Sequence, residues 1–241
     1  TQPSSICLDR VIEGRPRLRI HLRCRRGLEG FVRDEAQAAL AARGRFRLLE
    51  TRPGYVALLP LAPFSLADLY QLRCFASVNF VVGLVKDDAP DARAGAVAAA
   101  ITSPLARHLF TTLTDGSHRY RLDFVGRGHQ RAAVQQVVAR AYTQCPDLLN
   151  DPRGAPWSVD LHDTPHGLSV ELRPRLSPDP RMFYRTDDVA AASHPPLAAS
   201  MARLAGRLDD EVVWDPFCGS GLELVECALR GGVQHLFGSD I

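Results

Sequence analysis

A short glycine turn near residue 218 has the residue types of a ligand-binding loop. It runs from Asp215 through Pro216, Phe217, Cys218, Gly219 and Ser220 to Gly221. Its glycines let the backbone turn tightly and approach a ligand closely, because no Cβ stands in the way. The preceding run EVVWD predicts a buried strand, and the following LELVECALRGG predicts a helix. The free N–H groups at the start of that helix suit a negatively charged group.

An acidic residue follows the turn at a distance typical of nucleotide sites. Asp240 lies 21 residues after Gly219, at the end of a second predicted strand. In doubly wound folds an acid at this place accepts hydrogen bonds from ribose hydroxyls. The turn and Asp240 together therefore predict a site for an adenosine-containing ligand.

Three common glycine motifs do not fit the turn. Leu224 stands where the dinucleotide fingerprint has its third glycine, and no Gly-Lys-Ser/Thr of a P-loop follows. A nucleophile elbow would need glycines at the positions of Cys218 and Leu222. S-adenosylmethionine fits better, because it has no phosphates and its carboxylate can meet the turn's N–H groups. The plain alternative is a structural glycine turn of a βαβ unit.

The elements that must position this turn fall into five segments. Residues 18–88 read as β-α-β-β-α-β, which is the ferredoxin-like order. The other segments are an N-terminal tail, a second mixed domain, a proline-rich linker and an incomplete nucleotide-type unit: 1–17, 92–174, 175–194 and 195–241. The fold class expected is α/β together with α+β.

Positive charge is concentrated away from the glycine turn. Of 29 basic residues 28 are arginine; residues 1–60 carry a net +6, 118–185 a net +3 and 186–241 a net −6. The guanidinium fork matches phosphate oxygens, so the basic segments predict a partner with phosphates. The alternative is arginine spread over solvated faces. The candidate RNA-binding residues are Arg119, Arg121, Arg127 and Arg131.

The turn resembles the cofactor motif of a known enzyme family. DPFCGSG followed by ELVECA is similar to the motif of class I, Rossmann-like, S-adenosylmethionine-dependent RNA methyltransferases that carry a THUMP domain. RGLEGFVRDE resembles the family's N-terminal ferredoxin-like domain, and RYRLDFVGRG, WSVDLH and LSVELRPRLSPDPRMFYR resemble its THUMP domain and exit. The resemblance implies methylation of guanosine N2 in tRNA or rRNA, with the THUMP domain, at 92–174, docking structured RNA.

The family's catalytic motif is not found in these residues. That motif is Asn, Asp or Ser followed by Pro-Pro and an aromatic residue, which orients the target amine and stacks on the extruded base. The sole Pro-Pro, Pro195-Pro196, stands between His194 and Leu197. The catalytic residues are therefore expected beyond Ile241, and the chain is expected to be inactive alone.

Composition limits the remaining classes of function. The six cysteines show no C-x-x-C spacing, which argues against a zinc site, and no metal is expected. No apolar run approaches the length of about 18 residues needed for a membrane span, and reduced thiols favour a cytoplasmic protein. Two alternatives to the RNA methyltransferase stay open: a non-catalytic RNA-binding module and a DNA adenine-N6 methyltransferase.

Overall fold

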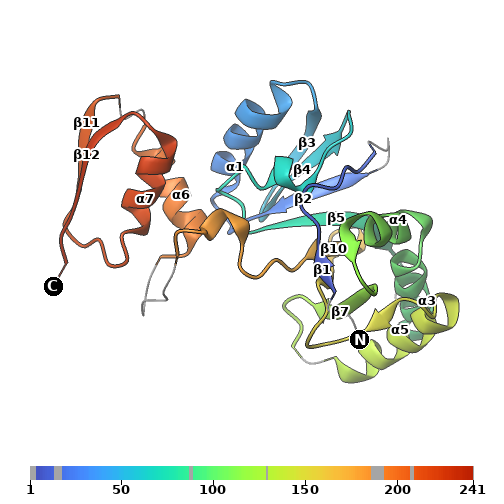
Figure 1. Ribbon diagram of the computed structural model, residues 1–241. Coiled ribbons are helices and arrows are strands. Elements are labelled where there is room, and N and C mark those ends of the chain that lie inside the picture. Colours follow the sequence, from blue (N-terminus) through green and yellow to red (C-terminus); the bar gives the residue numbers. More distant parts are fainter. Residues whose placement is uncertain are drawn as a thin grey trace.

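An eight-stranded mixed sheet dominates the structure. The computed structural model describes residues 4–13, 18–86, 89–128, 130–185, 193–206 and 209–240. The strands lie in the order β3-β4-β2-β5-β10-β9-β7-β8. Figure 1 shows helices α1, α3, α4 and α5 beside this sheet and a separate C-terminal unit next to α1. The protein is thus a mixed α/β fold, as the sequence predicted at this coarse level.

The first half of the sheet follows the predicted order of elements. Its bounds are β2 Arg19–Arg23, α1 Glu29–Ala36 with a π-helical extension Gln37–Ala41, β3 Phe46–Arg52, β4 Tyr55–Pro60, α2 Leu66–Leu69 and β5 Ser77–Val85. Helix α2 begins in a capping box formed by Ser65 and Asp68 and is four residues long. The N–H groups of Arg73 and Cys74 donate to Glu35 Oε2, each at 2.9 Å, instead of extending a helix.

The second half contributes the remaining strands and most of the helices. Its bounds are α3 Pro90–Ile101, α4 Pro104–Leu113, β6 Thr114–Asp115, β7 Arg119–Phe124, α5 Arg131–Gln144, β8 Leu149–Asn150, β9 Trp157–Thr164 and β10 Gly167–Pro174. Strand β10 pairs antiparallel with β5, from Leu168 opposite Val85 to Leu172 opposite Phe80. This pairing makes one sheet of residues that the sequence analysis assigned to two separate segments.

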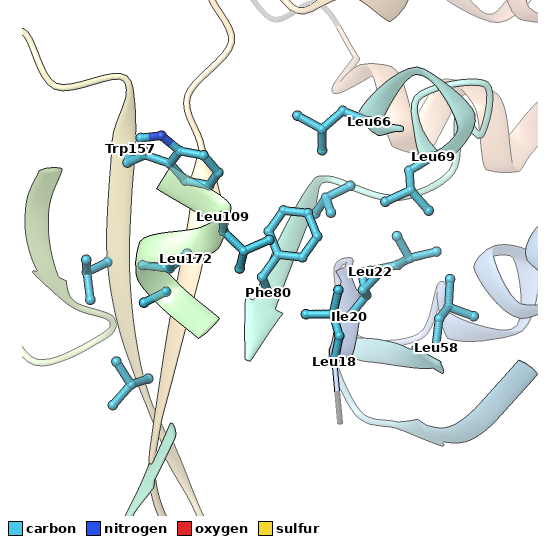
Figure 2. Packing of buried hydrophobic residues seen from close by; sticks show 14 of the residues in the cluster. Leu18, Ile20, Leu22, Leu58, Leu66, Leu69, Phe80, Leu109, Trp157 and Leu172 are labelled. Atoms are coloured by element: carbon cyan, nitrogen blue, oxygen red, sulfur yellow. The ribbon is translucent and has the colours of Figure 1, made fainter. Parts of the chain in front are cut away.

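One hydrophobic core runs through both halves. Figure 2 shows Leu22, Leu58 and Phe80 from the first half in the same cluster as Trp157 and Leu172 from the second half. In β2, β9 and β10 the alternate positions are polar, as the period of two predicts for a strand with one buried apolar face. Apolar burial on this scale is the main favourable term in folding, at roughly 25 cal/mol per Å² of apolar surface.

The N-terminal segment does not form the loose tail that the sequence predicted. Strand β1, Ser5–Ile6, pairs with β6, and Ile12 is fully buried, with its N–H donating to Phe64 O at 2.7 Å. The segment has no periodic apolar pattern because the two-residue strand β1 and the single side chain of Ile12 anchor it, which is too little regular structure to give a repeat. Residues 1–3 and 14–17 of the expected tail lie outside the described residues.

The C-terminal unit consists of α6 Pro195–Leu204, β11 Glu211–Asp215, α7 Leu222–Arg230 and β12 Val233–Gly238. The buried strand expected at EVVWD is wrong, since Val212 is 53% exposed and Trp214 65% exposed. Among the described residues β11 pairs with β12 alone, so its apolar side chains have little to cover them. Of the expected linker, 186–192 lie outside the described residues, whereas Pro180–Met182 form a 3-10 turn in which Arg181 is buried.

Candidate functional site

Strands β11 and β12 bring the predicted ligand-binding residues to one edge. The two strands run parallel, with Asp215 opposite Gly238, so both carboxyl ends lie together. The backbone closes the turn through Ser239, whose N–H donates to Asp215 O at 3.0 Å and whose O accepts from Cys218 N at 3.1 Å. This edge is where open α/β sheets bind their ligands.

The glycines of the turn adopt conformations that other residues avoid. Gly219 has φ +49° and Gly221 has φ +71°, both in the left-handed region. Gly221 is the residue before helix α7, and its N–H donates to Cys218 O at 2.6 Å. Asp215 Oδ1 accepts from the N–H of Phe217 at 3.0 Å, which fixes the entry to the turn. The glycine spacing found in the sequence thus has a physical cause in the backbone.

Asp240 meets the turn directly. Its Oδ2 accepts a hydrogen bond from the N–H of Gly219, so the two residues that were singled out 21 positions apart are in contact. A carboxylate has about four acceptor positions, so the group can accept more than one hydrogen bond. Asp240 therefore stabilises the turn in addition to any ligand role.

Gly238 is a site residue that the sequence analysis missed. A Cβ at this position would lie 2.8 Å from Cys218 Sγ and 2.9 Å from Leu224 Cδ1. In dinucleotide folds the third glycine of the fingerprint, on the helix, allows close helix–strand packing. Here Leu224 occupies that helix position and the glycine lies on the strand instead. The available signal was a glycine two residues before Asp240.

The start of helix α7 is accessible beside the turn. No side chain caps the helix, and Glu223 is the acidic residue of its first turn. Phe217 is 78% exposed and Ser220 is exposed, whereas Leu222 is buried. Amide N–H groups in the first turn can therefore face a carboxylate, and Phe217 offers an aromatic surface next to them.

A buried carboxylate fixes helix α7 to the first half of the sheet. Glu226, 1% exposed, accepts from Arg73 Nε at 2.6 Å, from Arg73 Nη2 at 2.8 Å and from the Tyr184 hydroxyl at 2.7 Å. Burial and the neighbouring carboxylate raise the pKa of Tyr184 to about 12. The sequence signal was an acid four residues after Leu222, on the buried face of α7.

A second ion pair of reversed polarity joins the same two regions. Arg203 on α6 donates to Glu35 Oε1 at 2.7 Å, and Glu35 on α1 is 3% exposed. One pair thus has its carboxylate on the C-terminal unit, at Glu226, and the other has it on helix α1, at Glu35. Because each carboxylate is buried, misplacing the unit would leave an uncompensated charge. The turn is therefore held in one orientation relative to the sheet.

The candidate RNA-binding arginines do not form one patch. Arg119 contacts Asp151 at 3.2 Å, and Arg127, beyond the other end of β7, forms a bidentate pair with Asp163. Arg131 is exposed at the first residue of α5. Arg121 follows the buried Tyr120 on β7 and therefore lies on the opposite face of the sheet. Among the described residues Arg121 has no ion pair. Two of the four are thus already matched by carboxylates.

The described residues contain no group of three or more His, Cys, Asp or Glu side chains arranged to hold a metal ion. No helix among them has the length and apolar character required to cross a membrane.

Comparison with known families matches the part of the chain that carries the turn. Residues 183–235 match the family profile of the RMKL-like methyltransferase domain. The match includes Glu226 and Tyr184 as well as the whole glycine turn. No curated protein sequence matches the chain.

Solved structures of methylases have a similar fold. TrmN from Thermus thermophilus has a TM-score of 0.63 and 19% identity, covering 92% of this chain and 65% of that one. A predicted N6-adenine-specific DNA methylase from Listeria monocytogenes has 0.59 and 20%, covering 89% and 55%. A possible methylase from Clostridium difficile 630 has 0.60 and 16%, covering 88% and 55%. The chain therefore spans between 55% and 65% of the length of these proteins.

Proposed function

We propose that this protein is an S-adenosylmethionine-dependent RNA methyltransferase that modifies the exocyclic N2 of guanosine in tRNA or rRNA. The observation that carries the proposal is the contact of Asp240 with Gly219: the glycine turn lies within the matched methyltransferase segment, and Asp240 follows five residues after its end. In this proposal the sheet of residues 18–174, with ferredoxin-like and THUMP domains, docks structured RNA. The residues from Asp215 to Gly221 and Asp240 bind one end of the cofactor.

The residues present fit S-adenosylmethionine. The first-turn amides of α7 suit the carboxylate of its methionine part, and the Asp240 carboxylate is an acceptor suited to ribose hydroxyls. When bound, the cofactor supplies an activated methyl group. The chain's own residues bind and orient it, and the groups that hold the target base are expected from residues after 241.

Isothermal titration with S-adenosylmethionine tests the cofactor site, using the protein expressed from its whole gene. Asp240→Ala should weaken binding by about 1–3 kcal/mol, the usual cost of leaving polar groups without a partner. Because Asp240 also holds Gly219, Asp240→Asn serves as the second variant: it keeps an acceptor for the Gly219 amide and should bind with intermediate affinity. Asp147→Asn, at an exposed loop position, is the matched control and should bind as wild type. Residues 1–241 alone should bind more weakly and transfer no methyl group.

Transfer of a tritium-labelled methyl group tests the substrate. Label on guanine N2 of RNA supports the proposal, whereas label on adenine N6 of DNA would make the protein a DNA methyltransferase. A protein that binds RNA but neither binds the cofactor nor transfers label would be a binding module. Equal cofactor affinity of wild type and Asp240→Ala would remove Asp240 from the site.

A further inference from the structure

A row of polar residues crosses the second half of the sheet opposite the core. Arg121 on β7 is in register with Ser158 on β9, and Ser158 is in register with Arg173 on β10. Neighbouring strands lie about 4.8 Å apart, so the two arginines flank Ser158 on one face. The N–H of Arg175 donates to Pro156 O at 2.7 Å, which continues the β10–β9 ladder by one step. By alternation Arg175 shares the face of Arg173.

A pocket of about 570 Å³ opens at this end of the sheet. Its walls come from the N-terminal segment, the start of β5, the loop before β9 and the segment that follows β10. Three arginines and several serine hydroxyls are among the residues that line it: Arg153, Arg173, Arg175, Ser4, Ser77 and Ser177. Asp179 is the one acidic residue in the described lining, and both its oxygens accept from Arg181.

The positive charge around the pocket exceeds the negative charge that neutralises it. Arg173 is paired with Asp160, with Nε–Oδ2 at 2.6 Å. Arg175 donates to the carbonyl O of Ala155 at 2.7 Å, and no carboxylate among the described residues pairs with Arg175, Arg153 or Arg121. Burial, and then repulsion from Arg121 and Arg173, lower the pKa of Arg175. The guanidinium groups that have no carboxylate partner favour the binding of an anionic ligand.

The chemistry of the lining selects the ligand. A guanidinium fork matches two phosphate oxygens at once. The hydroxyls of Ser4 and Ser77 already donate to Ser117 O and Asn79 Oδ1, so Ser177 is the serine of this group that can donate to the same phosphate. The volume falls within the range of about 300–1,000 Å³ of small-ligand sites, so a phosphate has room there together with its sugar.

We propose that this pocket binds a backbone phosphate of the RNA substrate, with Arg153 and Arg175 of its lining as the ligands and Arg121, on the neighbouring strand β7, adding positive charge. The inference rests on the proposed function for its choice of RNA. It replaces the dispersed arginines predicted from the sequence with one concave site formed by four separate parts of the chain.

The pocket is physically connected to the glycine turn. The segment that forms its wall leads directly to Arg181, whose Nη1 donates to Phe75 O at 2.7 Å and whose O accepts from Arg73 Nη2 at 3.0 Å. Arg73 in turn holds Glu226 on α7. RNA held in the pocket therefore lies in a fixed relation to the cofactor turn.

Binding of a tRNA transcript to the protein from its whole gene, measured by filter binding across salt concentrations, tests the pocket. Arg153→Gln and Arg175→Gln should each weaken binding about tenfold. Each should also reduce the log–log salt slope by about 0.7–0.9, the value for one lost phosphate contact. Arg175→Lys keeps the charge and should keep the slope. Arg107→Gln on α4 is the matched control, since Arg107 is exposed like Arg153 and has no ion pair among the described residues; it should change neither quantity.

The outcomes separate this inference from the proposed function. Pocket variants with wild-type affinity and slope, or a wild type that does not bind RNA, would overturn the pocket. Methyl transfer to RNA that is unaffected in the pocket variants would do the same and leave the function standing. Weakened RNA binding in these variants, without any cofactor binding or methyl transfer by the wild type, would support the pocket and refute the enzyme. Single-stranded DNA of the same sequence, if bound equally through the same arginines, would overturn the assignment to RNA.

Discussion

The two tryptophans of the chain lie in opposite environments, one buried and one exposed. The difference shows that the strands that carry them are stabilised in two different ways. Trp157 on β9 is fully buried; it packs against Phe110, and its Nε1 donates to Thr114 Oγ1 at 2.9 Å. Trp214 on β11 is 65% exposed. The large sheet is stabilised by burying its own apolar face. The β11–β12 pair is held instead by turn hydrogen bonds and by the ion pairs of α6 and α7.

The largest effect is expected where apolar burial is the cause. Trp157→Ala should lower the free energy of unfolding by about 3–5 kcal/mol, through the cavity and the lost contacts. Trp214→Ala should change it by less than about 0.5 kcal/mol, as for an exposed position. Urea denaturation followed by far-UV circular dichroism measures both variants. Similar losses for the two would abolish the contrast.

Breaking the ion pair between Glu226 and Arg73 should lower the stability of the protein by about 3 kcal/mol. Glu226→Gln removes the charge that balances Arg73 and weakens the acceptor of the Tyr184 hydroxyl, and breaking a buried ion pair costs several kcal/mol. Because the pair joins two regions, we expect the loss in local opening of α7 rather than in the large sheet. Native-state hydrogen exchange should show protection of α7 amides falling roughly 100-fold, with β9 and β10 unchanged.

The matched control for that prediction is Glu223→Gln on the same helix, where the described structure shows no ion pair. It should leave the exchange of α7 amides close to wild type. Equal effects of the two variants would mean that the general charge of the helix matters and the Arg73 contact does not.

A third test concerns a buried carboxylate within the large sheet. Glu171 is fully buried and is contacted by His21, Arg23 and Ser169. Burial by itself would raise its pKa, but the hydrogen bond and charge of His21, and the charge of Arg23, lower the pKa to about 2. The unfolded group, with a pKa of about 4.5, binds protons first on acidification, so stability is full above that pH and falls below it.

The expected loss from Glu171 is about 2 kcal/mol between pH 7 and pH 3, at 1.36 kcal/mol for each unit of difference in pKa. Unfolding of wild type and Glu171→Gln across this range isolates the contribution, since the difference between the two should shrink as the pH falls. His162, whose Nε2 lies 3.6 Å from Glu171, is the other titratable neighbour, and His162→Gln controls for it. A difference that does not depend on pH would contradict the low pKa.

Local sequence patterns predict many of the helices and strands and the glycine turn. They do not predict contacts between residues that are distant in the sequence. Period-two alternation is visible in the sequence of β7, β9 and β10, and the capping box of Ser65 and Asp68 marks the start of α2, because these signals are contained within a few residues. The pairing of β5 with β10 and the contact of Glu226 with Arg73 join residues about 90 and 153 positions apart. Nothing in either segment specifies which partner it meets.

The glycine turn shows the same limit at close range. Gly219, Gly221 and Asp240 were identifiable because backbone freedom and strand-end acids leave a sequence signature. Gly238 was not, because its role depends on the approach of Cys218 and Leu224 from the other side of the unit. The prediction of a buried strand at EVVWD was wrong for a related reason. An apolar run indicates side chains that favour burial, but it does not show which element, if any, packs over them.

The smallest effect is expected for a substitution in the C-terminal unit, and it tests whether this unit is packed as closely as the large sheet. Gly238→Ala places a Cβ within 3 Å of Cys218 Sγ and Leu224 Cδ1, at a backbone position where φ itself permits alanine. Overpacking of this kind costs about 1–2 kcal/mol when neighbours must shift. Gly238→Ala with Leu224→Ala removes one of the two contacts and should recover part of the loss, whereas Leu224→Ala alone should not stabilise the protein. Hydrogen exchange of β12 amides measures the local cost. Full tolerance of Gly238→Ala would show that the turn, unlike the large sheet, is adaptable, and that close packing of β12 on α7 does not define the site.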